Sequence, residues 1–522
     1  MSSGAVERGS NRTLLGLSVA MGGSLIVAAS FNFLLTPMMS DLGLSKEDSS
    51  IALAIPSTAS LLIVFVAGRL GDRRGHRRVI TWMGVLFIIG CALVMLAQGL
   101  ALLVIGLLFA GLAATSIQIV VFGLLSDCYP DPSSRARAFG TFGMVSPFAW
   151  MIFPVLTGYI VGIVSWRVVP LIWVVVGVVM VFAARFLLPP AREVESLGEV
   201  RTPILAGLTV VFVVQALSMV GNVGLISWWV LLMFALAVGS ALACWFLLRS
   251  NRVTSFSLQP LRIPRARLLL WVVVIIPLIN TVFLMTIAFQ YLWGLSVLQT
   301  ALIMVPAQAA AMLGTRLIAG PLMRRIGVTK TAVTFFSLLA VAMLCSFVMT
   351  PSSPLWVPAL YVLVYNVLTV AASITVSSGL MSTANDQNSG EVSAFRGSGT
   401  ALGQVLAVVL MNSAVFLIAQ AGMLSELEVD GDTAAQATST MQQLADGADS
   451  PSIMTSYSME LPSGTASVDD VLRDTFANGL HINGVLGALL SAACVVLVLR
   501  SARNGTREKV GARRRSRHDA ST

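Results

Sequence analysis

Residues 68–80 read G-R-L-G-D-R-R-G-H-R-R-V-I and form the densest charge cluster between two long apolar segments of the chain. Glycine at positions 68, 71 and 75 permits close helix approach and positive φ, so we expect a tight turn between two helices. Arginines beside apolar segments also occur in any membrane protein, where they mark the cytoplasmic side of the membrane. Acidic residues contribute little to this topology signal. A topology signal alone therefore explains the arginines but not Asp72.

The composition places this turn in a membrane protein. Of the 522 residues, 56% are hydrophobic and 11% are charged, against about 25% charged residues in an ordinary soluble domain. The net charge of +9 is also typical of nucleic-acid-binding proteins, but those proteins gather basic residues on a soluble face. Here the basic residues lie in short connections and in the tail 500–522, so they indicate topology, and we expect no nucleic-acid partner.

Segments of membrane-spanning length recur along the whole chain. About fourteen of them reach the roughly 20 apolar residues that a spanning helix requires, so the fold class is predicted to be all-α and polytopic. Basic connections alternate with acidic or short ones, which predicts cytoplasmic termini and an external acidic segment at 422–476. Residues 1–12 are polar and lack a small-residue cleavage site after a short apolar region, so we expect no removed signal peptide. The predicted spans include 14–38, 51–70, 138–161, 203–220, 268–291, 297–317 and 394–420.

The charged turn has a second, weaker copy. Its spacing, Gly68-x-Leu70-x-Asp72-Arg73-x-Gly75-x-Arg77, resembles the signature between the second and third helices of the major facilitator superfamily. The copy Gly320-x-Leu322-x-Arg324-Arg325-x-Gly327 follows after 320 − 68 = 252 residues, with Arg324 in place of Asp72. Transporters of this kind are built from repeats, and fourteen spans resemble the drug:proton antiporter branch of the superfamily.

The resemblance implies two six-helix bundles with an inserted helix pair. The expected parts are the N-terminal segment 1–13, the first bundle 14–200, the inserted pair 201–250, a linker 251–267, the second bundle 268–499 with its acidic segment, and the basic tail 500–522.

The same resemblance implies a cytoplasmic gate. Asp72 is expected to face the start of the corresponding helix in the other half, where free backbone N–H groups carry partial positive charge. Asp127 closes the fourth span and is similar to the second acid of the family's charge relay. Exposed ion pairs are worth about 0–1 kcal/mol each, so such a gate can open in every cycle. The gate set is Gly68, Asp72, Arg73, Gly75, Arg77, Asp127, Arg137 and Arg396.

The predicted membrane interior holds almost no charge. The family's first-span aspartate falls on Ala28 and its fourth-span arginine on Leu107, which leaves proton coupling open. Neutral polar residues remain, each more often a helix–helix hydrogen bond worth about 0.6 kcal/mol than a ligand contact. Together they describe a weakly polar, aromatic cavity that suits an amphipathic molecule better than a sugar or ion. The cavity set is Phe31, Asn32, Gln118, Asn280, Phe283, Gln308 and Asn366.

Prolines in the fifth span are candidate hinges for a rocking motion. Pro147 and Pro154 can loosen the helix there, although proline is also frequent in membrane helices without such a role. The family's fifth-span glycine pattern appears as Phe153-Pro154-Val155-Leu156-Thr157-Gly158. The hinge set is Pro147, Pro154 and Gly158.

The favoured function is a secondary transporter that exports an amphipathic small molecule or drug across the plasma membrane by alternating access. Its expected partners are membrane lipids and the substrate, with protons as a further candidate. Two alternatives remain: an exporter of a lipid or cell-envelope precursor, and a non-transporting sensor on the same fold. No G-x-S-x-G, metal-ligand spacing or phosphate loop is present, so we predict neither an enzyme nor a cofactor or metal.

Overall fold

The computed structural model is built of helices joined by short turns. No strand occurs in the described residues, and the predicted all-α class is confirmed for them. The described residues, apart from some individual side chains, are 10–43, 46–190, 201–223, 227–250, 259–279, 282–295, 297–384, 389–407 and 468–519.

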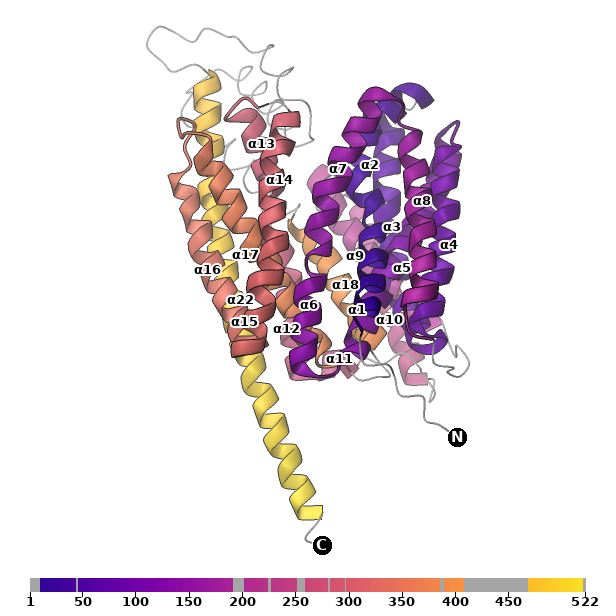
Figure 1. Cartoon of the computed structure of the whole chain (residues 1–522), viewed down its shortest axis with the longest axis vertical. Helices are drawn as coiled ribbons and strands as arrows, with labels where there is room; N and C mark the ends of the chain where they lie inside the picture. The colour runs from indigo at the N-terminus through magenta and orange to yellow at the C-terminus, as the bar shows by residue number, and fades with distance from the viewer. Residues whose placement is uncertain are drawn as a thin grey trace.

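The first half of the chain forms one bundle, on the right in Figure 1. Large buried side chains fill its interior, among them Trp173, whose Nε1 donates a hydrogen bond to Ser30 Oγ at 3.0 Å. The bundle consists of α1 (Asn11–Ser24), α2 (Ile26–Leu42), α3 (Lys46–Arg74), α4 (His76–Met95), α5 (Leu100–Cys128), α6 (Pro132–Phe142), α7 (Val145–Ile163) and α8 (Val168–Leu187).

The second half forms another bundle, with α14 to α17 and α22 on the left in Figure 1. The yellow helix α22 packs against α12 and α16 and extends past the bundle at the end where both chain termini lie, here named the terminal end. The elements are α11 (Gln259–Arg262), α12 (Pro264–Ile279), α13 (Val282–Tyr291), α14 (Val297–Gly314), the π-helix η1 (Thr315–Ala319), α15 (Gly320–Ile326), α16 (Val328–Leu344), the 3₁₀-helix η2 (Cys345–Val348), α17 (Trp356–Met381), α18 (Ser389–Leu406) and α22 (Val468–Asp519).

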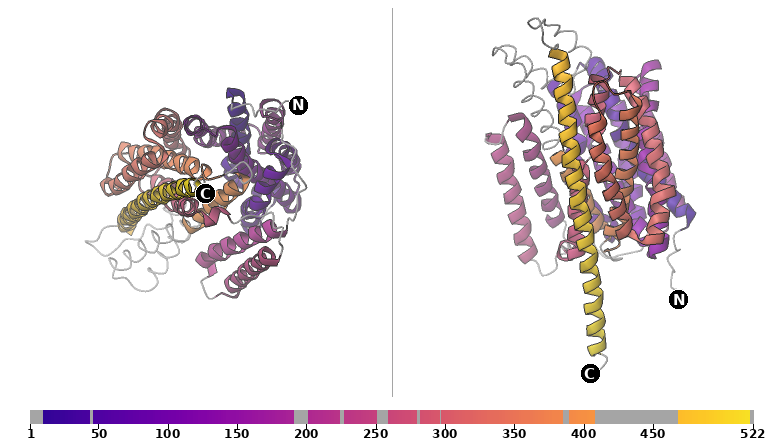
Figure 2. Two further views of the ribbon diagram at one scale, coloured as in Figure 1. Left: turned by 90° about the horizontal axis from the view of Figure 1, so that it is seen from below. Right: turned by 90° about the vertical axis from the view of Figure 1, so that its left-hand side faces the viewer.

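Two helices, α9 (Arg201–Val223) and α10 (Trp228–Ser250), lie beside the bundles (Figure 2). Helix α9 packs against α3, where Gln215 Nε2 donates to Thr58 Oγ1 at 3.1 Å. Helix α10 packs against α9, and the hydroxyls of Thr209 and Ser240 are 3.0 Å apart.

Eleven helices of the described chain are long and apolar enough to cross a membrane, which confirms the polytopic class. The predicted spans 51–70 and 203–220 correspond to α3 and α9, which are not among the eleven. The predicted span 394–420 begins as α18, and its residues after 407 lie outside the described part. The acidic segment lies outside it up to residue 467.

Several predicted single spans are divided, and proline explains two of the divisions. The ring of Pro147 excludes a hydrogen bond to the carbonyl of residue 143, and α6 ends just before that residue, at Phe142. Pro321 likewise has no N–H to donate to the carbonyl oxygen of Leu317, which lies in the π-helix η1. A π-turn accommodates an extra residue without ending the helix, so the span 297–317 continues into α15.

The two copies of the charged turn share their backbone conformation. Gly75 precedes α4 and Gly327 precedes α16, both with φ of 84°. They are separated by 327 − 75 = 252 residues, the same interval that relates Gly68 to Gly320. Positive φ favours glycine, so each copy needs this residue to turn one helix into the next.

Candidate functional site

Helices α3 and α18 cross at two glycines, although they belong to different bundles. The backbones of Gly68 and Gly390 are so close that a Cβ added to either residue would overlap the carbonyl oxygen of the other. Close to this crossing, the rings of Phe65 and Phe395 meet edge to face with centroids 5.1 Å apart. The ends of α3 and α5 together with the start of α18 are named the junction below.

Asp72 spans the junction. Its Oδ1 accepts a hydrogen bond from the Gly390 N–H at 2.8 Å, and its Oδ2 accepts from the Glu391 N–H at 3.2 Å. The hydroxyl of Ser389 lies 3.4 Å from Asp72 Oδ1 and 3.1 Å from Asp127 Oδ2. The first N–H groups of a helix have no partner inside it and carry partial positive charge. The Asp72 carboxylate of α3 therefore supplies the hydrogen-bond acceptors that the first N–H groups of α18 would otherwise lack.

The electrostatic environment makes this contact sensitive to water entry. Burial raises the pKa of the Asp72 carboxyl well above its ordinary value, while the Gly390 N–H opposes that rise; the charges of Glu391 and Asp127 raise the pKa further. An ionised Asp72 therefore depends on the N–H groups of α18. Separation of the helices would return the carboxylate to water, which replaces those donors.

His76 belongs to the same cluster, and the sequence analysis did not single it out. Its ring lies between the two acids, with Nε2 3.7 Å from Asp72 Oδ1 and Nδ1 3.7 Å from Asp127 Oδ2. The signal was present in the sequence, because His76 follows Asp72 by four residues inside the quoted motif. Within the described residues, no group of three or more His, Cys, Asp or Glu side chains is placed to hold a metal ion.

The arginines of the predicted gate have different partners. The Arg396 guanidinium lies 3.6 Å from the ring centroid of Phe122, a cation–π contact from α18 to α5 across the junction. Arg77 donates to the carbonyl oxygen of Arg185 on α8, inside its own bundle. Arg137 is exposed on α6, and Arg73 is half-buried at the end of α3.

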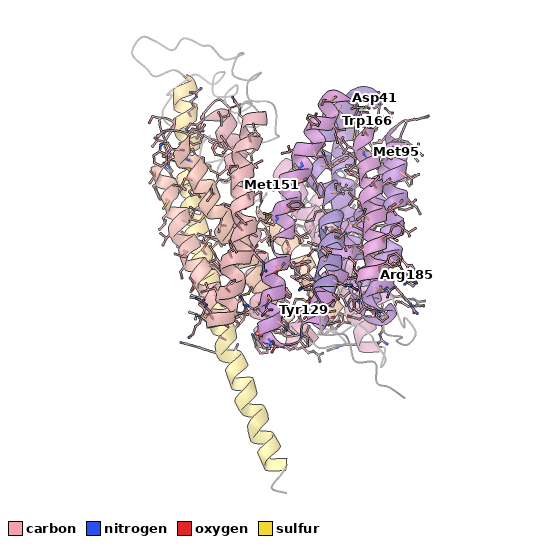
Figure 3. The ribbon with its side chains drawn as sticks, viewed as in Figure 1. Asp41, Met95, Tyr129, Met151, Trp166 and Arg185 are labelled. Atoms are coloured by element: carbon pink, nitrogen blue, oxygen red, sulfur yellow. The ribbon has the colours of Figure 1, made fainter. Side chains whose placement is uncertain are left out.

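A second crossing joins α6 to α15. A Cβ added to Gly140 would lie 2.6 Å from the Cα of Gly320, so these backbones also touch. Nearby, the Ser126 hydroxyl at the end of α5 donates to the Met381 carbonyl at the end of α17, at 3.1 Å. Tyr129, three residues after Ser126, lies at the terminal end in Figure 3, whereas Asp41 and Trp166 lie at the opposite end. Both crossings therefore join the bundles near the terminal end.

The predicted cavity residues are only partly described. Phe31 and Asn366 are buried, and Gln118 and Gln308 are half-buried. The side chains of Asn32 and Phe283, and the whole of Asn280, lie outside the described part. A groove of about 770 Å³ lies elsewhere, between α9 and α10, and is lined by Arg201, Ile204, Leu205, Ala243, Phe246 and Leu247.

The predicted hinge residues differ in their surroundings. Pro147 is buried in the first turn of α7, next to the division from α6. Pro154 lies within α7, which continues through it without a break. Gly158 is exposed, and a Cβ added there would meet no atom within 4 Å.

Comparison with protein families gives one match over most of the chain. The model of the Major Facilitator Superfamily matches residues 14–408, a range that includes both crossings.

Individual relatives are similar over shorter stretches. An uncharacterized MFS-type transporter of Mycobacterium tuberculosis is 29% identical over 190 residues, which are 35% of this chain and 27% of that protein. The drug efflux pump JefA of the same species is 24% identical over 269 residues, 49% of this chain and 52% of its own length. The chain thus spans about half or less of these relatives.

Among solved structures, the human organic anion transporter MFSD10 has the same fold. Its TM-score is 0.59 at 12% sequence identity, over 95% of this chain and 100% of that one.

Proposed function

Because the chain belongs to the major facilitator superfamily and is one of its membrane transporters, we propose that it exports an amphipathic small molecule by alternating access. The observation that carries this proposal is the Asp72 carboxylate of one bundle bonded to the first N–H groups of α18 in the other. Such a contact joins two rigid bodies through a few hydrogen bonds, each worth only about 0.5–3 kcal/mol net. A gate of this strength can close firmly and still open in every cycle.

The alternation of basic and acidic connections supports a cytoplasmic position for the terminal end, and therefore for both chain termini, in a plasma-membrane protein. With the junction closed at that end, the conformation corresponds to an outward-facing state in this proposal. The gate residues are Asp72, Asp127, Ser389, Gly68 and Gly390.

The substrate class rests on two supports. The name of JefA, a drug efflux pump, fits an exporter of amphipathic compounds. Phe31, Gln118 and Gln308 would give the proposed cavity a weakly polar, aromatic lining, which favours such a substrate over a sugar or ion. These residues, with Asn366, are the proposed cavity lining.

The test is uptake of a fluorescent amphipathic dye into inside-out vesicles that contain the full chain. We expect dye accumulation above that of vesicles without the protein, and a marked fall for Asp72→Asn. Arg324→Gln is the matched control, because Arg324 occupies the equivalent position of the second copy and is exposed. Folded protein that moves none of a panel of dyes would contradict the proposal, and movement of a lipid analogue alone would support the lipid-precursor alternative.

A further inference from the structure

The groove between α9 and α10 lies outside both bundles and has no part in the proposed gate. At about 770 Å³ it has the size of a small-molecule site, which is roughly 300–1,000 Å³. Ile204 of α9 and Phe246 of α10 are 45% and 67% exposed, so the groove opens to the surroundings of the protein. Five of its six lining residues are apolar, and the sixth is the cation Arg201. Such a lining suits a molecule with a long apolar part and an anionic end.

The cationic end of the groove lies at the terminal end of the protein. A Cβ added to Gly207 would lie 2.6 Å from the carbonyl oxygen of Leu62, and further along α9 Gln215 donates to Thr58. The partners on α3 move backwards as α9 advances, so these two helices run in opposite directions. Because α3 ends at the junction, α9 begins at that end, with Arg201 as its first residue.

The last turn of α10 lies beside the first turn of α9. The hydroxyls of Thr209 and Ser240 are 3.0 Å apart, and the Cys244 thiol donates to the Thr202 carbonyl oxygen at 3.8 Å. Residues later in α10 therefore pair with residues earlier in α9. Arg249, exposed near the end of α10, is thus a second cation at the end of the hairpin where α9 begins.

Aromatic residues on α10 indicate where this end lies in a membrane. Trp228 at the start of α10 and Trp245 near its end are both exposed, and the Arg249 guanidinium lies 4.7 Å from the ring centroid of Trp245. From Trp228 to Arg249 there are 249 − 228 = 21 residues, a helical rise of about 31 Å. This rise matches the roughly 30 Å hydrocarbon core of a bilayer, and Trp is enriched at both interfaces. The cations therefore lie at headgroup level, with the apolar part of the groove in the adjoining leaflet.

We propose that the α9–α10 groove binds one anionic phospholipid from the leaflet at the terminal end. Its phosphate group lies at Arg201, with Arg249 nearby, and one acyl chain lies along the apolar lining. A guanidinium can hold two phosphate oxygens at once through parallel N–H···O bonds. A zwitterionic headgroup brings its own cation to the two arginines and gains less from them. The proposal needs only a membrane-spanning chain, so it does not depend on what the chain exports.

The position of the hairpin gives such a lipid a structural effect. Val211 and Val214 of α9 form a buried cluster with Leu61 of α3. Ala401 and Leu402 of α18, in the other bundle, pack against the same cluster. Within the described chain, α10 packs extensively against α9 alone. A lipid between α9 and α10 would hold α10 to a helix that touches both bundles, and a ligand that binds the folded state raises its unfolding temperature.

Native mass spectrometry of the delipidated full chain in detergent tests the proposal. Phosphatidylglycerol and phosphatidylcholine with identical acyl chains are titrated separately, so that the lipids differ only in their headgroups. We expect the first phosphatidylglycerol to bind about tenfold more tightly and to raise the unfolding temperature more, because each basic residue at the headgroup level favours an anionic lipid by about fivefold.

Two substitutions test the role of charge. Arg201→Gln should lower the affinity for phosphatidylglycerol by about fivefold, whereas Arg201→Lys keeps the charge and should keep most of the affinity. Arg325→Gln is the matched control, because Arg325 is exposed in the last turn of α15 and does not line the groove. Its affinity for both lipids should equal that of the parent.

A further pair of substitutions tests the groove itself. Ala243→Phe fills the apolar lining without a change of charge and should weaken the binding of the first phosphatidylglycerol. Ala241→Phe, at an exposed position of α10 that does not line the groove, should not. Equal affinities for the two lipids in the parent would mean non-specific boundary lipid only and would overturn the proposal. A phosphatidylglycerol preference that is unchanged in Arg201→Gln would also overturn it. If Ala243→Phe fails to run as monodisperse protein, the exposed Arg201 variants decide.

Discussion

The two crossings at the terminal end are alike in packing and different in charge. Gly68 of α3 meets Gly390, and its repeat equivalent, Gly320 of α15, meets Gly140. At the first crossing, Asp72 bonds to the opposing helix. At the second, the equivalent residue is Arg324, which is exposed. Close glycine contact is therefore common to both repeats, whereas the carboxylate contact occurs in only one. We expect the first crossing to act as the chemically controlled gate and the second as a passive pivot.

The largest effect is expected from a side chain added at the charged crossing. A Cβ at Gly390 would lie 2.8 Å from Asp72 Oδ1 and overlap the Gly68 backbone. In Gly390→Ala the crossing of α3 and α18 therefore cannot close unless whole helices move. Overpacking of this kind costs about 2 kcal/mol, which corresponds to roughly a thirtyfold lower initial rate of dye export. Gly397→Ala is the control on the same helix, since a Cβ added there would meet only Ile119, at an ordinary contact distance of 3.7 Å. Equal rates for the two variants would show that the crossing does not close during transport.

The second effect concerns the charge itself. Asp72→Asn keeps the size of the side chain but exchanges charge-assisted hydrogen bonds for neutral ones, a loss of about 1.4 kcal/mol or a tenfold lower export rate. Arg324→Gln, at the equivalent position of the pivot, should leave the rate within about twofold because exposed charges contribute little. If both substitutions slow export equally, the two crossings have the same role and the comparison fails.

The local part of this comparison could be predicted from sequence. The glycine and charge spacing around Asp72 is short, so the turn, the repeat and the positive-φ glycines follow from one segment and its copy. The helix divisions were harder to predict, since Pro147 and Pro321 interrupt apolar segments without changing their hydropathy. The π-helix before Gly320 has no compositional signature at all.

The contacts across the junction could not be predicted from spacing. Ser389 and Gly390 follow Asp72 by more than 300 residues, and only the family resemblance pointed to the start of that helix. The side chain of Arg77 is oriented by α8, where it donates a hydrogen bond to the carbonyl oxygen of Arg185. His76 stood within the quoted motif, but its approach to Asp127 of another helix is made only by the fold.

A smaller effect is expected at the pivot. A Cβ at Gly140 would lie 2.6 Å from the Gly320 Cα and 3.1 Å from its nitrogen, so Gly140→Ala should separate α6 from α15 slightly. A cost of about 1 kcal/mol corresponds to roughly fivefold slower export. The reciprocal variant Gly320→Ala places its Cβ 3.3 Å from Gly140 and should be milder. A fall for Gly140→Ala as large as that for Gly390→Ala would mean that the second crossing is also a gate.

The smallest effect tests whether the pivot bends at the division between α6 and α7. Pro147→Ala restores an N–H that can bond the carbonyl of residue 143, so α6 and α7 can join into one stiffer helix. The division lies just after Gly140, and a stiffer helix should slow export by about twofold, since one neutral backbone hydrogen bond contributes about 0.5 kcal/mol. Pro154→Ala is the matched control, because α7 continues through Pro154 without a break, and its export rate should equal that of the parent. A larger effect at Pro154 than at Pro147 would move the bending point into α7, away from the α6–α15 crossing, and the pivot would then have to be sought where α7 packs against α14.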